Sequence, residues 1–399
     1  MRSGTTRDVP IAERVGEVRS WTPERDEPDG SFIYIDLSAV DQETKAITGA
    51  RELPCSEAPS RARQLVRTND VLVATVRPNL NGVAQVPPHL DGATASTGFC
   101  VLRPGEHLDS RFLYHWVRSP RFIADMVRKA TGASYPAVSD RIVLESRIPC
   151  YPIEEQRRIA AILDRADALR AKRSAALAKL DVLAQSIFLD LFGDPATNPK
   201  GWPTTTLRTL VDVNPRSAAA SVVASASEAS TVSFVPMAAV SENTRRVTEY
   251  EQRSRESVAK GYTPFRKGDV LVAKITPCFE NGKICRVDDM PTENGYGSTE
   301  FHVFRAASEE VARYAFALLA LPTIRARGAR AMKGAAGQKR VPADFFADLL
   351  VPRPTQSALR EFSRRIAALE RERRIGERSE AGLGGLFLSL QDRAFRGAL

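Results

Sequence analysis

"YPIEEQRRIAAILDRADALRAKR", residues 151–173, opens a long periodic segment near the middle of this 399-residue chain. Pro152 suits the first helical position, and Glu154 and Glu155 would face the positive end of the helix dipole. Apolar residues then recur at alternating spacings of three and four for about four heptads, which is typical of a coiled-coil seam. The pattern predicts a spacer helix over residues 152–193, with Ile159, Ile162, Leu169, Leu180 and Leu183 in its seam.

A second and weaker seam lies over residues 354–399. Each glycine in it costs about 1 kcal/mol relative to alanine, so this helix needs a partner. An antiparallel pair would bury both apolar stripes, whereas the alternative is that each helix packs on its own domain. A helix of about 38 residues would span roughly 57 Å, more than one DNA turn of roughly 34 Å. The second seam contains Phe362, Ile366, Leu369, Phe387 and Leu390, and the glycines are Gly376, Gly382, Gly384 and Gly385.

The chain also repeats itself at an offset of about 200 residues, and such a repeat fixes an architecture more firmly than local propensity does. "NDVLVATVRPNLNGVAQV" from Asn69 matches "GDVLVAKITPCFENGKICRV" from Gly268. "STGFCVLRPG" from Ser96 likewise matches "STEFHVFRAA" from Ser298. We therefore expect two similar domains, each followed by one of the two helices.

Each copy has the pattern of an α+β domain. Val71, Val73 and Thr75 alternate as in a strand, and the amphipathic run over residues 112–129 predicts a helix. The predicted domains are residues 1–151 and 194–353, each preceding its helix. "SAAASVVASASEAST", residues 217–231, occurs only in the second copy and predicts a surface loop. The predicted fold is thus α+β, with a pseudo-twofold repeat and an antiparallel coiled coil.

Composition limits the possible partners and compartments. The net charge of +9 favours a polyanionic partner, among which nucleic acid is one candidate. The five scattered cysteines form neither a disulfide framework nor a CxxC metal set, which fits a reducing, cytoplasmic location. No apolar run approaches the roughly 20 residues that span a bilayer, and the first residues lack the apolar core of a signal peptide. We expect no membrane insertion and no export.

Four motifs in a fixed order resemble the DNA-specificity subunit of type I restriction-modification systems, and the resemblance covers essentially the whole chain. These are "PIEEQRRIAAILDRADALRAKR" from Pro152, "FLDLFGDPATNPKGWPTTTL" from Phe188, the twofold "GDVLVA"-like strand, and "SLQDRAFRGAL" from Ser389. The first copy departs from the pattern because it lacks the "GWP" that opens the second at Gly201.

The resemblance implies a non-catalytic reader of double-stranded DNA that serves in phage defence. Each recognition domain would read one half of a split target, and the helices would set the gap between the halves. The helices would also dock two adenine-N6 methyltransferase subunits, which translocating endonuclease subunits join. It further implies no cofactor in this chain, since S-adenosylmethionine, ATP and magnesium would belong to the partners. A scaffold of a methylation-only or other phage-defence system, without a cleaving subunit, is the alternative.

The residues themselves favour a reader over an enzyme. The sequence has no Asn/Asp-Pro-Pro-Tyr/Phe motif for a flipped adenine and no GxxxxGK[ST] phosphate loop. "GDVLVAK" from Gly268 has Ala273 where a metal nuclease would need a second carboxylate. The four histidines stand alone in the sequence, which favours surface or core positions over metal ligation.

Basic residues cluster near the end of each copy. Between Val311 and Ala343 there is no acidic residue, and in the first copy only Asp125 accompanies the basic residues of the equivalent stretch. Such stretches can neutralise phosphates, although a solvated helix face is the alternative. The basic residues are Arg111, Arg118, Arg121, Arg128 and Lys129 in the first copy, and Arg313, Arg325, Arg327, Arg330, Lys333, Lys339 and Arg340 in the second.

Base choice requires side chains that reach base edges in the major groove. We expect them on loops where the two copies differ, because different side chains would read different half-sites, although variable loops without a function would differ in the same way. The candidates after the shared strand are Arg77 and Asn79 in the first copy, with Lys274 and Thr276 in the second. Those after the basic stretch are Ser134, Tyr135 and Ser139 in the first copy, with Gln338 and Lys339 in the second.

Overall fold

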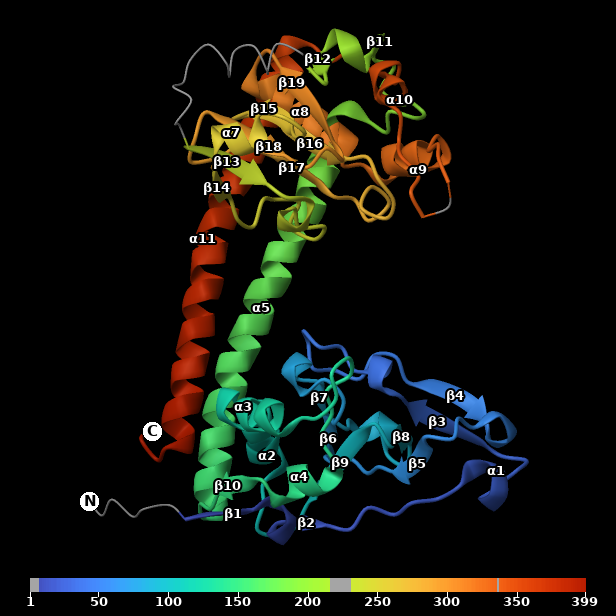
Figure 1. The fold of residues 1–399 in the computed structure, drawn as a ribbon, viewed down its shortest axis with the longest axis vertical. Coiled ribbons are helices and arrows are strands. Elements are labelled where there is room, and N and C mark those ends of the chain that lie inside the picture. The colour runs from blue at the N-terminus through green and yellow to red at the C-terminus, as the bar shows by residue number, and fades with distance from the viewer. Residues whose placement is uncertain (1–6, 216–230, 336) are drawn as a thin grey trace. The chain divides into compact units, whose positions relative to one another are not determined.

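The computed structural model describes residues 7–215, 231–335 and 337–399, so the predicted surface loop lies outside the described residues except for Thr231. The chain forms two compact units. The first contains Met1–Ala175 and Glu377–Leu399, and the second contains Ala176–Gly376. Two long helices, α5 (Ile153–Phe192) and α11 (Gln356–Phe395), each contribute one segment to each unit (Figure 1). Helix α11 is continuous through Gly382, Gly384 and Gly385.

The first unit contains two four-stranded sheets, ordered β2-β9-β6-β7 and β4-β3-β8-β5. Strands β3 and β8 pair in parallel. A separate pair joins β1 (Asp8–Pro10) to β10 (Arg147–Pro149) near the start and end of the domain. The remaining strands are β2 (Val15–Gly16), β3 (Ser31–Ile35), β4 (Arg51–Pro54), β5 (Ala62–Leu65), β6 (Val71–Ala74), β7 (Val83–Gln85), β8 (Thr94–Ser96) and β9 (Phe99–Pro104).

The second unit repeats this topology strand for strand. Its sheets are ordered β12-β19-β16-β17 and β14-β13-β18-β15, and β13 and β18 are its parallel pair. Because β11 pairs with β20 as β1 pairs with β10, the first copy has an equivalent opening strand although it lacks "GWP". The strands are β11 (Thr204–Thr206), β12 (Val211–Val213), β13 (Thr231–Val235), β14 (Glu251–Ser254), β15 (Thr263–Arg266), β16 (Val270–Ala273), β17 (Ile284–Arg286), β18 (Asn294–Gly297), β19 (Phe301–Ala306) and β20 (Leu350–Pro352).

The prediction of a single helix over residues 112–129 is wrong, because the structure has two helices there. The chain breaks at Ser119 and Pro120, since proline lacks an N–H donor and disfavours helical geometry in the residue before it. The Ser119 side chain caps the second of these helices. The short helices are α1 (Pro23–Asp26), α2 (Ser110–Val117), α3 (Pro120–Lys129), α4 (Asp140–Glu145), α7 (Arg255–Val258), α8 (Glu309–Leu319), α9 (Pro322–Arg330) and α10 (Ala343–Ala347).

Within each unit the long helices run antiparallel and pack on a domain helix. In the first unit the beginning of α5 and the end of α11 share a core with α2, through residues such as Leu163, Phe395 and Phe112. In the second unit the end of α5 and the beginning of α11 share a core with α8, where Phe192 lies 5.3 Å from Phe362 and 5.0 Å from Tyr314 between ring centroids. The predicted α+β fold with an internal repeat and antiparallel helices is confirmed.

The buried face of the long helices differs from the simple seam. Leu163 is fully buried although it lies outside the predicted seam, while Leu169 and Leu183 are 49% and 45% exposed. The reason is that each long helix packs against a domain as well as against its partner, so the buried stripe shifts toward the domain. Of the other seam residues, Ile159, Phe362 and Phe387 are buried, and Ile162, Leu180, Ile366, Leu369 and Leu390 are half-buried.

Candidate nucleic-acid interface

The two predicted loops of the first copy lie against each other. The Arg77 backbone N–H donates to the Pro136 carbonyl at 2.7 Å, and the Val138 N–H donates to the Thr75 carbonyl at 2.9 Å. Val76 and Ala137 form a β-bridge between these two hydrogen bonds. We call residues 75–81 and 131–138 the first loop pair. The structure therefore brings together candidates that are more than fifty residues apart in the sequence, such as Arg77 and Tyr135.

The second copy has the same arrangement. The Thr276 N–H donates to the Lys339 carbonyl and the Val341 N–H donates to the Lys274 carbonyl, both at 2.9 Å. A β-bridge joins Ile275 to Arg340. We call residues 274–282 and 333–341, apart from residue 336, the second loop pair. By these contacts Thr276 is the structural counterpart of Arg77, and Lys274 is the counterpart of Thr75.

A glycine turn closes each of the later loops. Thr131 and Ala137 exchange backbone hydrogen bonds of 3.0 and 2.9 Å, as Lys333 and Arg340 do in the second copy. Gly132 has φ +104°, and a Cβ there would lie 2.9 Å from the Tyr135 carbonyl oxygen. Only glycine fits this turn without strain, so the loop that carries Tyr135 has a defined shape.

Most candidates in the first loop pair present exposed side chains. The Arg77 guanidinium carbon lies 4.7 Å from the centroid of the Tyr135 ring, and Tyr135 is 68% exposed. Asn79 and Ser134 are also exposed. Ser139 has a structural role, because its side chain accepts a hydrogen bond from the Ile142 N–H and caps α4.

The second loop pair is more constrained. Arg340 forms a two-pronged ion pair with Glu300, with Nε–Oε2 of 2.9 Å and Nη2–Oε1 of 2.8 Å. The hydrogen bond from Arg340 lowers the pKa of Glu300. The Thr276 hydroxyl donates to Glu280 Oε1 at 2.9 Å, and Lys274 is half-buried. Gln338 and Lys339 are therefore its most accessible candidates.

Lys45 supports the first loop pair and was not among the predicted site residues. Its Nζ donates to the Asn81 carbonyl at 2.6 Å, where Asn81 adopts the left-handed conformation with φ +50°. Burial, reinforced by the charge of Arg118, lowers the Lys45 pKa to about 8. The repeat places Arg245 at the equivalent position of the second copy, and this shared cation was the available sequence signal.

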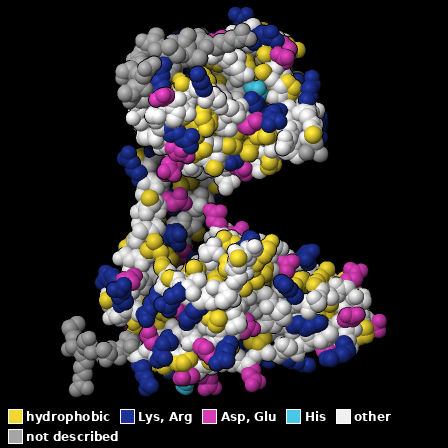
Figure 2. All heavy atoms as spheres, in the orientation of Figure 1, with side chains coloured by type: hydrophobic (Ala, Val, Ile, Leu, Met, Phe, Trp, Pro, Cys, Tyr) yellow, Lys and Arg dark blue, Asp and Glu magenta, His cyan; other side chains and the backbone are white. Residues whose placement is uncertain are grey.

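The basic stretches of the two copies differ in how they are paired. Asp125 is the one acidic residue within the first stretch of the sequence, but distant segments supply further acids. Arg111 pairs with Asp164 and Arg118 with Asp167, and both of these acids lie on α5. Arg121 pairs with Asp8. Arg128 and Lys129 pair with Asp125 itself. Lys and Arg side chains accordingly stand among Asp and Glu side chains on the face shown in Figure 2.

The second basic stretch keeps more of its cations available. Arg313 pairs with Glu309 and Glu370, and Arg340 with Glu300. Within the described ranges, no carboxylate forms an ion pair with the remaining members, which are Arg325, Arg327, Arg330, Lys333 and Lys339. Arg330, Lys333 and Lys339 are also exposed. The second copy therefore presents the more accessible positive charge for a phosphate backbone.

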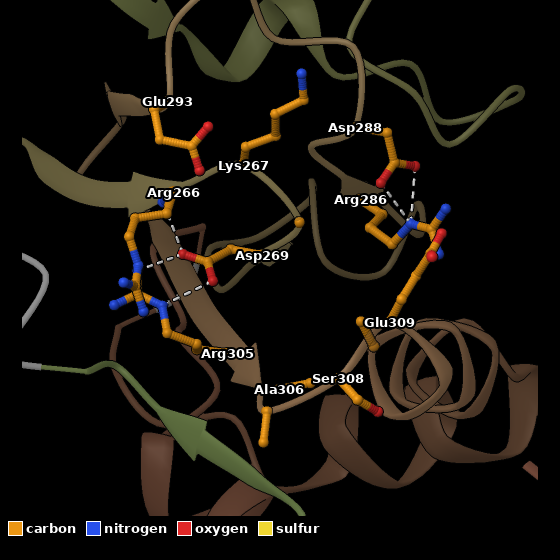
Figure 3. A pocket seen from close by; sticks show the side chains of 13 residues that line it. Arg266, Lys267, Asp269, Arg286, Asp288, Glu293, Arg305, Ala306, Ser308 and Glu309 are labelled. Atoms are coloured by element: carbon orange, nitrogen blue, oxygen red, sulfur yellow. Dashed lines mark hydrogen bonds and ion pairs between the residues drawn. The ribbon is translucent and has the colours of Figure 1, made fainter.

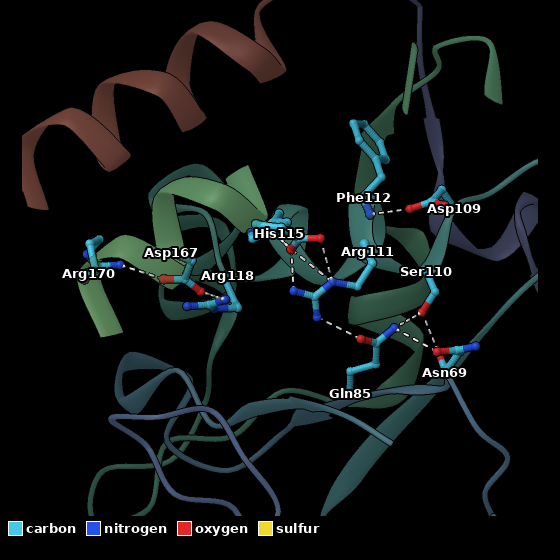
Figure 4. A network of polar contacts seen from close by, with 11 residues as sticks. Asn69, Gln85, Asp109, Ser110, Arg111, Phe112, His115, Arg118, Asp167 and Arg170 are labelled. Carbon is cyan, nitrogen blue, oxygen red and sulfur yellow. Dashed lines mark hydrogen bonds and ion pairs between the residues drawn. The ribbon is translucent and has the colours of Figure 1, made fainter. Parts of the chain in front are cut away.

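A polar network fastens α2 of the first unit to α5 (Figure 4). Asp164 on α5 accepts hydrogen bonds from Arg111, with Nε at 3.0 Å from Oδ1, and it lies 2.7 Å from His115 Nε2. Burial alone would raise the pKa of Asp164, but the hydrogen bonds from His115 and Arg111 outweigh this effect and lower it to about 2. Burial lowers the pKa of His115, which favours the neutral ring. This network is structural.

Each copy also contains a buried Arg–Asp pair beside its central strand. In the second copy the pair lies at a cavity of about 280 Å³ (Figure 3), where Arg305 donates to Asp269 from Nε at 2.9 Å and from Nη2 at 2.6 Å. Arg103 and Asp70 form the same pair in the first copy. The cavity lining mixes basic and acidic side chains, which gives it no clear preference for an anion or a cation.

The described residues include neither a candidate metal site nor a candidate membrane span. No group of three or more His, Cys, Asp or Glu side chains there could hold a metal ion. His115 and His302 are buried in the two domain cores, whereas His89 and His107 are exposed. No helix in this part of the chain has both the length and the apolar character needed to cross a bilayer.

The two units share one α+β topology and one arrangement of loops, and each contains antiparallel segments of the two long helices. No family model matches the chain. It is 37% identical over 161 residues to the type I restriction enzyme EcoAI specificity subunit of Escherichia coli, a match that covers 40% of this chain and 26% of that protein. The EcoEI specificity subunit of the same organism is 36% identical over 161 residues, with the same coverage.

The chain thus spans about a quarter of the length of the curated relatives it matches. One similar solved structure is described as "Structural basis underlying complex assembly and conformational transition of the type I R-M system". The match covers 100% of both chains, with a TM-score of 0.61 and 24% sequence identity. This likeness shows that the two chains share a fold. The resemblance to type I specificity subunits that the sequence motifs indicated is confirmed over the 161 matched residues.

Proposed function

We propose that this chain is the non-catalytic DNA-specificity subunit of a type I restriction-modification complex, and that each domain reads one half of a split duplex target. The observation that carries the proposal is the loop pair, which occurs at the same place in both domains with different side chains. Arg77 in one domain corresponds to Thr276 in the other. Two similar scaffolds with different reading residues are what a target with two unlike halves requires.

The charged residues support two separate roles within the proposed interface, which are contact with phosphates and choice of bases. Lys333, Lys339 and Arg330 are exposed and carry no ion pair within the described residues, so they would contact phosphates and supply affinity without base choice. In the first domain, Arg128 and Lys129 would exchange Asp125 for phosphate. Base choice would then rest on side chains of the loop pairs. The recognition domains would be residues 1–151 and 194–353, with residues 152–193 and 354–399 as spacer helices.

The long helices would dock the partner subunits. They carry large apolar side chains that are exposed in this chain, and such side chains are available to pack against another protein. We infer that two adenine-N6 methyltransferase subunits bind there and that translocating endonuclease subunits then join. S-adenosylmethionine, ATP and magnesium would belong to those subunits. The exposed residues are Leu169, Val182 and Leu183 on α5, and Ile375, Leu386 and Leu388 on α11.

Mapping of N6-methyladenine tests this proposal. The full chain and the methyltransferase subunits from its own genome would be expressed, together and separately, in a host that lacks adenine methylation. The proposal predicts methylation only on co-expression, within a motif of two short parts separated by a fixed gap. The same methylation without this chain would contradict its role as the specificity subunit. Methylation by this chain alone would identify an enzyme.

A further inference from the structure

The backbone around Arg77 is held in place from two sides. Arg77 has φ +51°, a conformation that side-chain-bearing residues rarely adopt, and its N–H is bonded to the Pro136 carbonyl. Asn81 closes the same turn with φ +50°, and Lys45 donates to its carbonyl. A side chain on so constrained a backbone starts from a fixed position, which reduces the entropy lost on binding.

The Arg77 side chain is positioned as well. Its guanidinium carbon lies 4.7 Å from the centroid of the Tyr135 ring, within the range of a cation–π contact. Within the described ranges no carboxylate pairs with Arg77, and the residue is exposed. Within the described ranges the Arg77 guanidinium donates no hydrogen bond, so its N–H donors are free. The edge of the guanidinium has the fork geometry that matches two adjacent acceptors.

We propose that Arg77 reads a guanine in the half-site of the first domain, and that Tyr135 is the positioning residue that holds its guanidinium. In the major groove only guanine presents two adjacent acceptors, O6 and N7, and an arginine fork that bonds both is the commonest specific contact. This inference rests on the proposed function, and it deepens that function by naming one base and the pair of residues that selects it.

Among its described residues, the second loop pair has no arginine held against an aromatic ring as Arg77 is. The counterpart of Arg77 is Thr276, whose hydroxyl donates to Glu280, and the arginine of that loop pair, Arg340, is held by Glu300. An ion-paired arginine would have to give up its carboxylate before it could bond a base. The two half-sites should therefore differ in this respect, and substitution of Arg77 should alter only one of them.

Binding of the full chain with its methyltransferase subunits to base-substituted duplexes tests the inference. A duplex selected by the wild type would be compared with duplexes in which each position in turn carries the other bases. The inference predicts one guanine in the first half-site whose replacement weakens binding about 5- to 150-fold. Arg77→Ala and Arg77→Lys should both remove most of this preference, because lysine lacks the fork.

Variants of Tyr135 show whether its ring positions the Arg77 guanidinium or only supports the structure of the domain. Tyr135→Ala should weaken the preference at the same guanine and leave the other positions unchanged, whereas Tyr135→Phe should retain it because the ring remains. Lys333→Ala is the matched control, since loss of a phosphate contact weakens binding to all sequences alike. Thermal unfolding would confirm that the variants fold, and Arg77→Lys is conservative enough to serve if Arg77→Ala does not.

The possible results distinguish failure of the proposed function from failure of the inference that Arg77 reads a guanine. If the wild type prefers no sequence, the proposed function fails and this inference fails with it. If the wild type selects a two-part target but no guanine responds to Arg77→Ala and Arg77→Lys, only the inference is overturned. An equal loss at every position in Tyr135→Ala would contradict the positioning role of Tyr135.

Discussion

Arg305 on β19 bonds Asp269 through both Nε and Nη2, at 2.9 and 2.6 Å, and both side chains are almost fully buried. The pair ties the segment before β16 to β19, and Arg103 and Asp70 do the same in the first unit. The earlier loop of each pair directly follows β6 or β16, so its position depends on a strand framework that each domain braces in the same way.

Arg305→Met should therefore destabilise the chain strongly, because it leaves the Asp269 carboxylate buried without its partner. Removal of one member of a buried ion pair typically costs about 3 to 5 kcal/mol in the free energy of unfolding. Arg141→Met is the control, since the Arg141–Glu145 pair is exposed and should contribute little to stability. Urea denaturation would measure both, and equal small losses would show that the buried pair does not brace the domain.

Asp164 should give the stability a specific dependence on acid pH. Its pKa of about 2 lies below the ordinary value of 3.8, so the ionised carboxylate favours the folded chain. This contribution is complete above about pH 4 and is lost as pH falls from about 4 to about 2. Asp164→Asn should cost about 1 to 2 kcal/mol at pH 7, because the side chain is 35% exposed and water screens it, and the cost should fade across that window.

Unfolding of the wild type and of Asp164→Asn would be compared between pH 7 and pH 2. Asp190→Asn is the matched control, since this carboxylate also lies on α5 but is largely exposed. A difference between Asp164→Asn and the wild type that stays constant across the pH range would contradict the assignment.

The two loop-pair cations Lys333 and Arg340 should affect DNA binding differently. Lys333→Ala removes a cation that has no ion pair within the described residues, and it should lower the slope of log affinity against log salt by about 1. Arg340→Ala should leave the slope nearly unchanged, because Glu300 already neutralises this charge. Titrations between low and moderate salt would measure both slopes, and equal changes in the two variants would count against this distinction.

The exposed apolar residues of the long helices should matter for assembly and not for folding. Val182→Glu should weaken binding of the methyltransferase subunits about tenfold or more, because it places a charge in the proposed contact, while the unfolding midpoint stays the same. Leu350→Glu is the control, since Leu350 is also exposed but lies on β20 of the recognition domain. Equal binding by both variants in a quantitative pull-down would place the partners elsewhere.

Much of the fold could be predicted because the repeat and the helical periodicity are patterns within the sequence itself. The predictions that failed include those for residues whose burial depends on tertiary packing. Leu163 is buried because α5 packs against a domain as well as against α11. A heptad pattern describes the contact between two helices only, so it does not predict the contact with the domain. Pro120, by contrast, was a visible signal that the predicted helix over residues 112–129 should break.

The candidate site was harder to predict, because its partners come from distant segments. Arg340 meets Glu300 and Arg118 meets Asp167, so a stretch without local acids is not a stretch without ion pairs. The contact between Arg77 and Tyr135 likewise depends on a β-bridge that no local pattern specifies. Comparison of the two copies was informative, because candidate positions at which they differ, such as Arg77 and Thr276, lie on loops that the fold brings together.

Selection of bound duplexes from a random DNA pool would show whether both domains read DNA bases. The full chain would be used together with the methyltransferase subunits of its own genome. The account predicts two short motifs separated by a fixed gap, with one motif changed by substitutions in the first loop pair and the other by substitutions in the second. A single contiguous motif, or no enriched sequence, would contradict the claim that both domains read DNA bases.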